Sequence, residues 1–166
     1  MSTEFDVKLS ANDMYAFNMY HAYTSVQGIV PVVLGIAVLT IACISDDFQG
    51  GFSRYLYMLI GLVFILYIPL SLWMRARRVI LMDDVLGNPI HYNFCDEGVV
   101  VTAHNGESAT LEWQYVYKAV ATKNMIYIFS NRVNAYIIPK AAVGDKLDDM
   151  YSIIKANVAD YRVKLK

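Results

Sequence analysis

Histidine and cysteine are the side chains of this chain that could carry nucleophilic chemistry. His91 and Cys95 lie four positions apart, and Asp96 follows directly, so this segment has the residue types of a Cys–His pair. The alternation of apolar and polar residues around them is typical of a β-strand, in which four residues span about 13 Å. Since that distance is far beyond hydrogen-bond reach, we expect an edge histidine and a half-buried thiol rather than a catalytic pair.

The other cysteine and histidines offer no redox or metal site. Cys43 lies in a long apolar segment and Cys95 in a polar one, so we do not expect a disulfide between them. His21, His91 and His104 have no cysteine or carboxylate partners at the spacing of metal ligands. The glycine-rich phosphate-binding, nucleophile-elbow and zinc-protease motifs are absent from the sequence. We therefore expect no enzyme activity, no cofactor and no metal.

A few basic and aromatic residues could form a binding surface. Lys118 and Lys123 lie on or beside one expected strand, and Lys140 follows a proline. If the sheet curls, these lysines could share a rim that faces anionic lipid, where each contributes about 1 kcal/mol. They could equally be ordinary solvated lysines. Trp113 and Tyr117 divide in the same way between a ligand surface and the hydrophobic core, and the core is favoured for a Trp on an apolar face.

The composition is more apolar than that of a soluble domain. Of 166 residues, 57% are hydrophobic and 17% are charged, against about 25% charged residues in an average soluble domain. The formal net charge of −1 argues against a nucleic-acid partner. The apolar excess is concentrated in Val26–Ile44 and Tyr55–Met74, neither of which contains an ionisable charge. Each is long enough as a helix to cross a bilayer, and we expect a transmembrane hairpin, since core helices of soluble domains retain a polar stripe.

The residues at the end of the second apolar segment predict its orientation. Trp73 is expected at the headgroup level, and Arg75, Arg77 and Arg78 follow it within five positions. Basic residues next to a span are retained in the cytoplasm, so we expect both termini of the hairpin protein there. A transporter is disfavoured because ion pathways usually place an ionisable residue within a span.

The N-terminal segment, residues 1–25, predicts a strand over Phe5–Leu9 and a helix over Ala11–Tyr23. Ser10 and Asp13 have the spacing of a capping box at the start of that helix. The helix is rich in aromatic residues and methionine, which fits either the membrane surface or packing against the C-terminal domain. Whether the strand joins the C-terminal sheet is left open by the sequence.

Residues 79–166 predict an α+β cytoplasmic domain that follows the hairpin of residues 26–78. An amphipathic stripe indicates a helix over about Asp145–Tyr161, with Asp145 as the N-cap. Short runs separated by turn residues indicate six antiparallel strands. These strands are Ile90–Phe94, Val99–Ala103, Ser108–Trp113, Val116–Thr122, Met125–Phe129 and Val133–Ile138. A bent antiparallel sheet with a C-terminal helix over its open end is the outline of a pleckstrin-homology-like (PH-like) domain.

A set of scattered residues combines single aromatic side chains, a glycine and a Pro-Lys pair. They are Asp13, Tyr15, Phe17, Tyr92-Asn93-Phe94, Gly98-Val99, Trp113, Val116, Lys118 and Ile138-Pro139-Lys140. In these residues the chain resembles the YcxB-like family of small bacterial membrane proteins. The resemblance implies an architecture, a two-helix hairpin with a C-terminal domain, and a bacterial inner-membrane location. It implies no reaction.

These observations favour a membrane-anchored adaptor or regulator that recognises a protein, a peptide or a lipid headgroup. The alternative is a structural subunit of a larger membrane complex, because Gly28 and Gly35 lie on one helix face. A hydrolase or transferase that uses Cys95 is a third class. The expected partners are the bilayer and an unidentified membrane or cytoplasmic protein.

Overall fold

The computed structural model describes residues 2–44 and 51–165 and divides the chain into two compact units. The sheet unit comprises Met1–Phe17 and Arg77–Lys166, and the hairpin unit comprises Asn18–Ala76. The sheet unit is therefore discontinuous in sequence, with the hairpin unit inserted into it. This differs from the three consecutive segments expected from the sequence, because the N-terminal strand belongs with the C-terminal strands.

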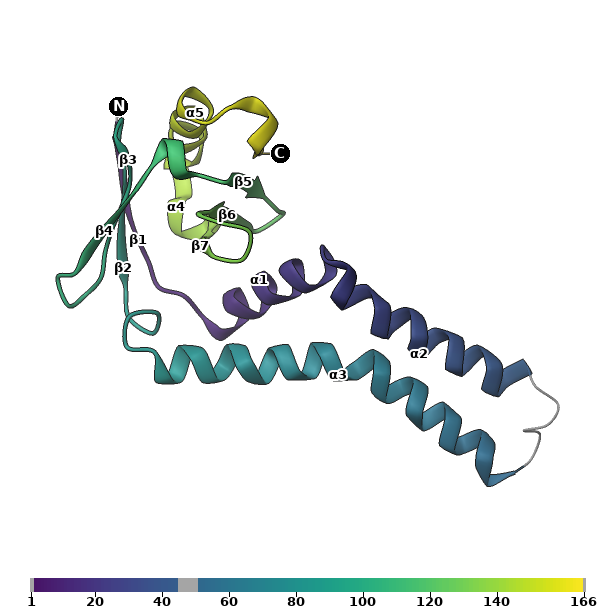
Figure 1. Ribbon diagram of the computed structural model, residues 1–166. Coiled ribbons are helices and arrows are strands. Elements are labelled where there is room, and N and C mark those ends of the chain that lie inside the picture. Colours follow the sequence, from purple (N-terminus) through teal and green to yellow (C-terminus); the bar gives the residue numbers. More distant parts are fainter. Residues whose placement is uncertain (1, 45–50, 166) are drawn as a thin grey trace. The chain divides into compact units, whose positions relative to one another are not determined.

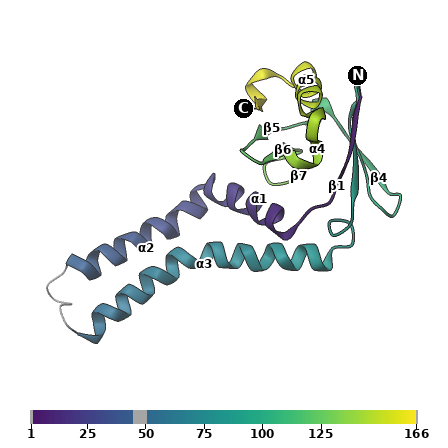
Figure 2. The same cartoon turned by 180° about the vertical axis from the view of Figure 1, so that it is seen from behind.

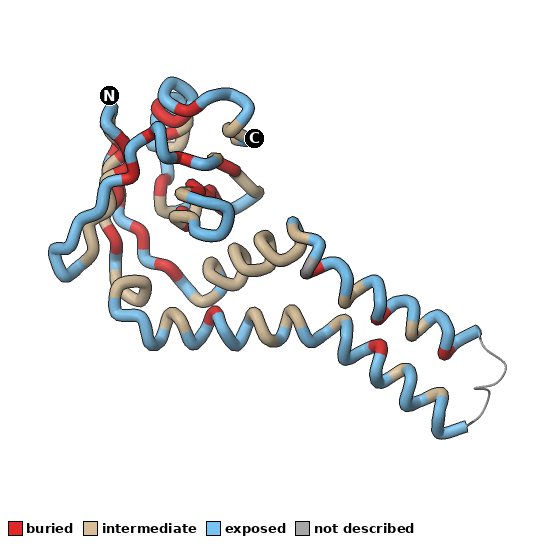
Figure 3. Tube along the Cα trace, in the orientation of Figure 1, coloured by how far each residue is buried: buried red, intermediate tan, exposed pale blue. Residues whose placement is uncertain are grey.

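The hairpin unit is built from two long helices, α2 (Val26–Ile44) and α3 (Phe52–Met82) (Figures 1 and 2). The last residues of α3, from Arg77 on, belong to the sheet unit. The helix α2 has the predicted bounds, whereas α3 extends past the predicted Tyr55–Met74 at both ends. Most residues of both helices are exposed, as the pale blue tube of Figure 3 shows. Of the most apolar 18-residue stretch of α3, 6% is buried.

One helix of the described chain, α3, is by itself long and apolar enough to cross a membrane. A second candidate span is obtained if two successive helices, Ala11–Tyr23 and Gly28–Ile44, are taken together as one broken membrane helix. The angle between them is 76°. Length and composition thus identify one or two candidate spans.

The helices α2 and α3 lie close together where both carry glycine. A Cβ atom on Gly35 would lie 2.8 Å from the backbone oxygen of Gly61, and one on Gly61 would lie 2.9 Å from the backbone oxygen of Gly35. Both glycines are buried. The small residue at each position is therefore what allows the two backbones to meet.

The sheet unit contains two four-stranded sheets. The first has the order β1-β2-β3-β4, all antiparallel, from β1 (Thr3–Val7), β2 (Ile90–Phe94), β3 (Gly98–Thr102) and β4 (Ser108–Glu112). The second has the order β7-β6-β5-β8, from β5 (Lys118–Ala121), β6 (Met125–Phe129), β7 (Ala135–Pro139) and β8 (Val163–Lys164). The predicted single bent sheet is therefore wrong in detail. A 3-10 turn at Trp113–Tyr115 interrupts the chain between β4 and β5, and β8 pairs parallel to β5.

The N-terminal strand completes the first sheet. β1 pairs with β2 in a register that joins Thr3 to Phe94 and Val7 to Ile90. The capping box then begins α1 (Ala11–Tyr23), because the Asp13 carboxylate accepts from the Ser10 backbone N–H at 2.9 Å. The predicted helix bounds and cap are confirmed.

The C-terminal helix is shorter than predicted. After a short α4 (Lys140–Val143), α5 runs over Leu147–Asn157 and buries Met150, Ile153 and Ile154. Asp145 lies in a preceding 3-10 turn and does not cap α5. The chain becomes extended at Val158, which is what brings β8 beside β5.

Candidate ligand-binding groove

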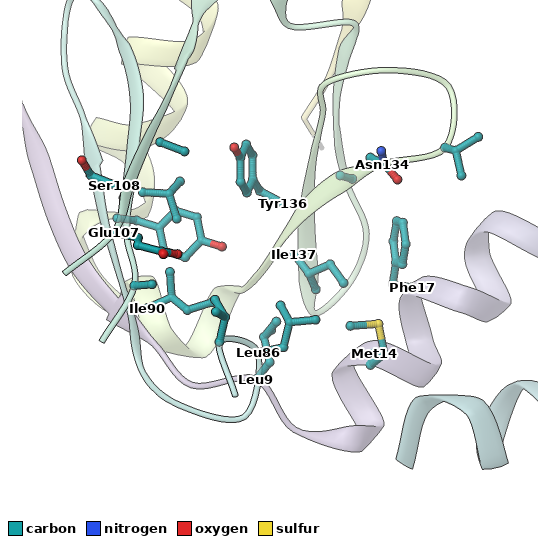
Figure 4. A pocket seen from close by; sticks show the side chains of 17 residues that line it. Leu9, Met14, Phe17, Leu86, Ile90, Glu107, Ser108, Asn134, Tyr136 and Ile137 are labelled. Atoms are coloured by element: carbon teal, nitrogen blue, oxygen red, sulfur yellow. The ribbon is translucent and has the colours of Figure 1, made fainter. Parts of the chain in front are cut away.

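A cavity of about 590 Å³ opens between the two sheets, and all of its lining residues belong to the sheet unit. We call it the groove (Figure 4). Its walls come from the inner face of β2 and β3, the start of β4, residues 133–137 of β7 and the turn before it, the first turns of α1, and the loop that follows α3. Six segments that are distant in sequence therefore meet around one space.

The N-terminal wall of the groove is positioned by the capping box of α1. Because the helix begins directly after Ser10, Leu9 stays buried and Met14 and Phe17, three positions apart, lie on one helix face. The Phe17 ring packs at 5.4 Å from the Tyr127 ring, between ring centroids. This aromatic contact fixes α1 against the β6 side of the second sheet.

The groove is largely apolar, with a small number of polar groups. Ser108, Asn134 and Glu107 lie among the lining residues, as do the phenols of Tyr92 and Tyr136. The Tyr92 and Tyr136 rings meet edge to face, with their centroids 6.1 Å apart. Burial raises the pKa of Tyr92, and the nearby Tyr136 raises it further, so the Tyr92 hydroxyl stays protonated throughout the physiological range.

Glu107 supplies the charge of the groove. It is the one lining residue, within the described chain, that carries a formal charge at neutral pH, and it is exposed. Asn105 and Gly106 form the tip of the β3–β4 hairpin, and the Glu107 backbone N–H donates to Asn105 Oδ1 at 3.0 Å. The turn therefore places the carboxylate at the rim and not within the apolar interior.

Trp113 is a core residue, which corrects its place in the predicted ligand surface. Its side chain is 7% exposed, and its indole Nε1–H donates to the Cys95 carbonyl at 2.9 Å. The Phe94 ring lies 6.1 Å away, between centroids. The indole N–H is hydrogen-bonded to the backbone and the ring packs in the core, so this side chain stabilises the fold and is not available to a ligand.

The predicted basic and aromatic surface is not assembled at one rim. Lys118 begins β5 and lies over the Phe129 ring, 4.3 Å from its centroid. Lys123 follows the far end of that strand, about 17 Å away along an extended backbone. Lys140 is on the side of Lys123, since its backbone N–H donates to the Asn124 carbonyl at 2.9 Å. Tyr117 is 45% exposed beside Lys118. None of these four residues lines the groove.

The predicted membrane-orienting residues all lie on α3. Trp73 is 42% exposed, and Arg75, Arg77 and Arg78 are exposed. The helix continues beyond these residues to Met82, so the basic flank is helical.

His91 and Cys95 have separate partners. His91 Nδ1 lies 2.7 Å from Asp6 Oδ1 on the neighbouring strand β1. The Cys95 thiol donates to the Gly98 carbonyl at 3.4 Å. Within residues 2–44 and 51–165, no three His, Cys, Asp or Glu side chains are grouped so that they could hold a metal ion.

Sequence reasoning missed the groove itself. The turn residues between the expected strands predicted the β3–β4 hairpin, but nothing in the local pattern indicated what this hairpin and its Glu107 would face. The residues of β7 read only as an apolar strand. Their role follows from strand order, which the sequence does not encode locally.

The fold first defines a class: a discontinuous two-sheet domain that carries a pair of long apolar helices. Residues 94–154 match the family model described as YcxB-like protein, which confirms the predicted resemblance. The matched segment runs from the last residue of β2 into α5 and includes the β3, β4 and β7 walls of the groove. No curated protein and no solved structure matches the chain.

Proposed function

We propose that the chain is a membrane-anchored binding or regulatory module of the bacterial inner membrane, and that its ligand binds in the groove. The ligand is a protein, a peptide or a lipid headgroup, and the module resembles a PH-like domain in having antiparallel strands followed by a C-terminal helix. The groove carries the proposal. Its volume falls in the range of small-ligand sites, about 300–1,000 Å³, and its apolar walls with a few polar groups are typical of such sites.

The apolar surface of the hairpin unit supports its role as the anchor. Val33 and Ile36 of α2 and Leu59 and Val63 of α3 are all more than half exposed. Soluble monomers rarely expose such a continuous apolar surface, whereas lipid is a suitable solvent for it. At 31 residues, α3 is about 46 Å long, which exceeds the hydrocarbon thickness of about 30 Å and leaves its basic end outside.

The discontinuity of the sheet unit supports an even number of membrane crossings. The chain leaves this unit after Phe17 and returns to it at Arg77, and β1 pairs directly with β2. Two paired strands cannot lie on opposite sides of a bilayer, so the inserted segment crosses twice if it crosses at all. With Arg75, Arg77 and Arg78 in the cytoplasm, both termini are cytoplasmic.

The alternative, a structural subunit that assembles through its hairpin, loses the observation that motivated it. Gly35 is buried against α3 of the same chain, and a Cβ on Gly28 would collide with the Ala22 backbone. Both glycines are therefore accounted for by contacts within the chain, and neither is left to mark an interface with another subunit.

Site-specific photocrosslinking in native membranes tests the proposal. A photoreactive amino acid at Val133 or at Ala109, which line the groove, should trap the same species, and one at the exposed Ala156 outside the groove should not. Identical crosslinks at all three positions, or none at either groove position, would contradict a ligand site here. Recovery of the full chain in the supernatant after ultracentrifugation without detergent would contradict the anchor.

A further inference from the structure

Strand β7 has an unpaired edge. It is the terminal strand of its sheet, with β6 on one side and no strand of the described chain on the other. The Ser130 N–H donates to the Asn134 carbonyl and the Lys140 N–H to the Asn124 carbonyl, so these are hydrogen-bonded pairs of the β6–β7 ladder. Because such pairs alternate in an antiparallel ladder, the backbone N–H and C=O groups of Ala135 and Ile137 point away from β6.

The groove runs along this edge. Five consecutive residues, Val133–Ile137, line it. Successive side chains of a strand point to opposite faces of the sheet, so consecutive residues share a cavity when it follows the strand's edge around both faces. On one side of the edge lie Met14 and Phe17 of α1, and on the other lie the inner face of β2 and β3 (Figure 4).

We infer that the groove takes an extended peptide segment, which pairs with the free edge of β7 as an additional strand. The inference rests on the proposed function and names its ligand. Of the two residues whose N–H and C=O point outward, Ile137 is 4% exposed, so the backbone groups of the half-buried Ala135 decide between a peptide and a lipid chain. An acyl chain in the groove would remove water from these backbone groups without replacing its hydrogen bonds, which is costly. A peptide backbone supplies the missing donors and acceptors, as in other cases of strand addition.

The groove also specifies the side chains of its occupant. Since both faces of the β7 edge have apolar walls, consecutive residues of the peptide meet apolar surface, unlike the alternating pattern of a half-exposed strand. Glu107 is the charged group of the rim, so the segment carries a basic residue next to its apolar core. The partner is a protein with an exposed, extended, apolar segment flanked by Lys or Arg.

The test uses the full chain in lipid nanodiscs and a library of acetylated heptapeptides. Each has three consecutive residues drawn from Val, Ile, Leu and Phe, flanked by Ser or Thr and one Lys. The tightest member is compared with its backbone N-methylated form, which keeps the side chains but cannot pair with a strand, and with dodecylamine as a lipid-like amine. Affinity is measured by fluorescence anisotropy, and pairing by residue-resolved amide hydrogen exchange.

The peptide should slow exchange at the Ala135 amide, and N-methylation should weaken its binding by about tenfold or more, since the two hydrogen bonds with the Ala135 backbone are lost. Glu107→Gln should weaken the Lys-containing peptide by about threefold. The matched variant Glu112→Gln, at the far end of the strand that follows Glu107 and outside the groove, should leave it unchanged.

Three results would overturn the inference: equal affinity for the N-methylated form, unchanged exchange at Ala135, or no library member that binds. If dodecylamine binds and no peptide does, the groove remains a ligand site and the proposed function stands without the peptide. If neither binds and Val133 yields no photocrosslink, the proposed function fails as well.

Discussion

The crossing of α2 and α3 leaves no room for a side chain at Gly35, and this predicts a large effect of Gly35→Leu. A Cβ at that position would lie 2.7 Å from Ile65 Cγ1 and 2.8 Å from the Gly61 oxygen. Non-bonded carbon atoms need about 3.5 Å, so the first contact alone requires a shift of about 0.8 Å. The Gly61 oxygen is part of the α3 backbone and moves only with the helix.

Two opposing effects set the magnitude. Overpacking of a close contact costs typically about 1–3 kcal/mol, and leucine, with its three further carbon atoms, belongs at the upper end. Replacement of glycine by leucine within a helix returns about 1 kcal/mol through helix propensity. We therefore expect the free energy of separating α2 from α3 to fall by about 2 kcal/mol.

The separation can be followed by energy transfer between dyes on the native Cys43 and on a cysteine introduced by Leu56→Cys, as SDS is titrated into dodecylmaltoside micelles. Ala37→Leu is the control, because Ala37 is on the exposed surface of the same helix. Gly35→Leu should lose energy transfer at a clearly lower SDS fraction than the control. Equal midpoints for the two leucine variants would refute close packing at the glycine pair.

Two further predictions concern the sheet unit. Trp113→Phe keeps an aromatic ring but removes the indole donor to the Cys95 carbonyl, which retains only the Gly98 N–H at 3.3 Å, so the free energy of unfolding should fall by about 1 kcal/mol in chemical denaturation; a loss no larger than that of the exposed Tyr115→Phe would show that the bond contributes nothing. Burial raises the pKa of Tyr92 above its ordinary value of 10.0, so the folded state holds this proton more tightly than the unfolded state, and the resulting stability is complete below that pH and declines as pH rises above it. Tyr92→Phe should therefore flatten the alkaline loss of stability, whereas Tyr161→Phe, 77% exposed, should retain it; matching alkaline profiles for the two variants would contradict the assignment.

Element types and several boundaries follow from local patterns in the sequence. Ser10 and Asp13 determine the start of α1 because their side chains and backbones bond to each other within one turn. The bounds of α2, β2 and β6 agree with the predicted runs for the same reason, since each is limited by residues next to it. These interactions join residues that are close in sequence, so they can be predicted without the rest of the chain.

What local patterns could not supply is the choice of partners. The stripe that predicted a helix up to Tyr161 includes Val158, which is buried although it lies beyond the end of α5. Burial of Val158 satisfies the apolar pattern in an extended conformation as well as in a helix. Tyr161 completes the stripe by spacing alone and is exposed.

The candidate site depends still more on long-range pairing. The alternation around Trp113 fits either a core or a surface position. Its indole N–H donates to the Cys95 carbonyl, which is distant in sequence and lies beside Trp113 only in the folded sheet. The groove requires that β7 end its sheet and that α1 return to the C-terminal strands. Neither condition is a property of any one segment.

The pairing of β1 with β2 has a consequence for biogenesis. During translation β1 emerges before both long helices, and these are made before its partner strand appears. Until then the first strand has an open edge and nothing in its own sheet to pair with. If the hairpin unit is inserted into a membrane, as we propose, closure of this sheet requires both ends of the inserted segment to lie on the same side. A nascent chain with a misinserted helix would keep an unpaired strand, a suitable mark for quality-control proteases.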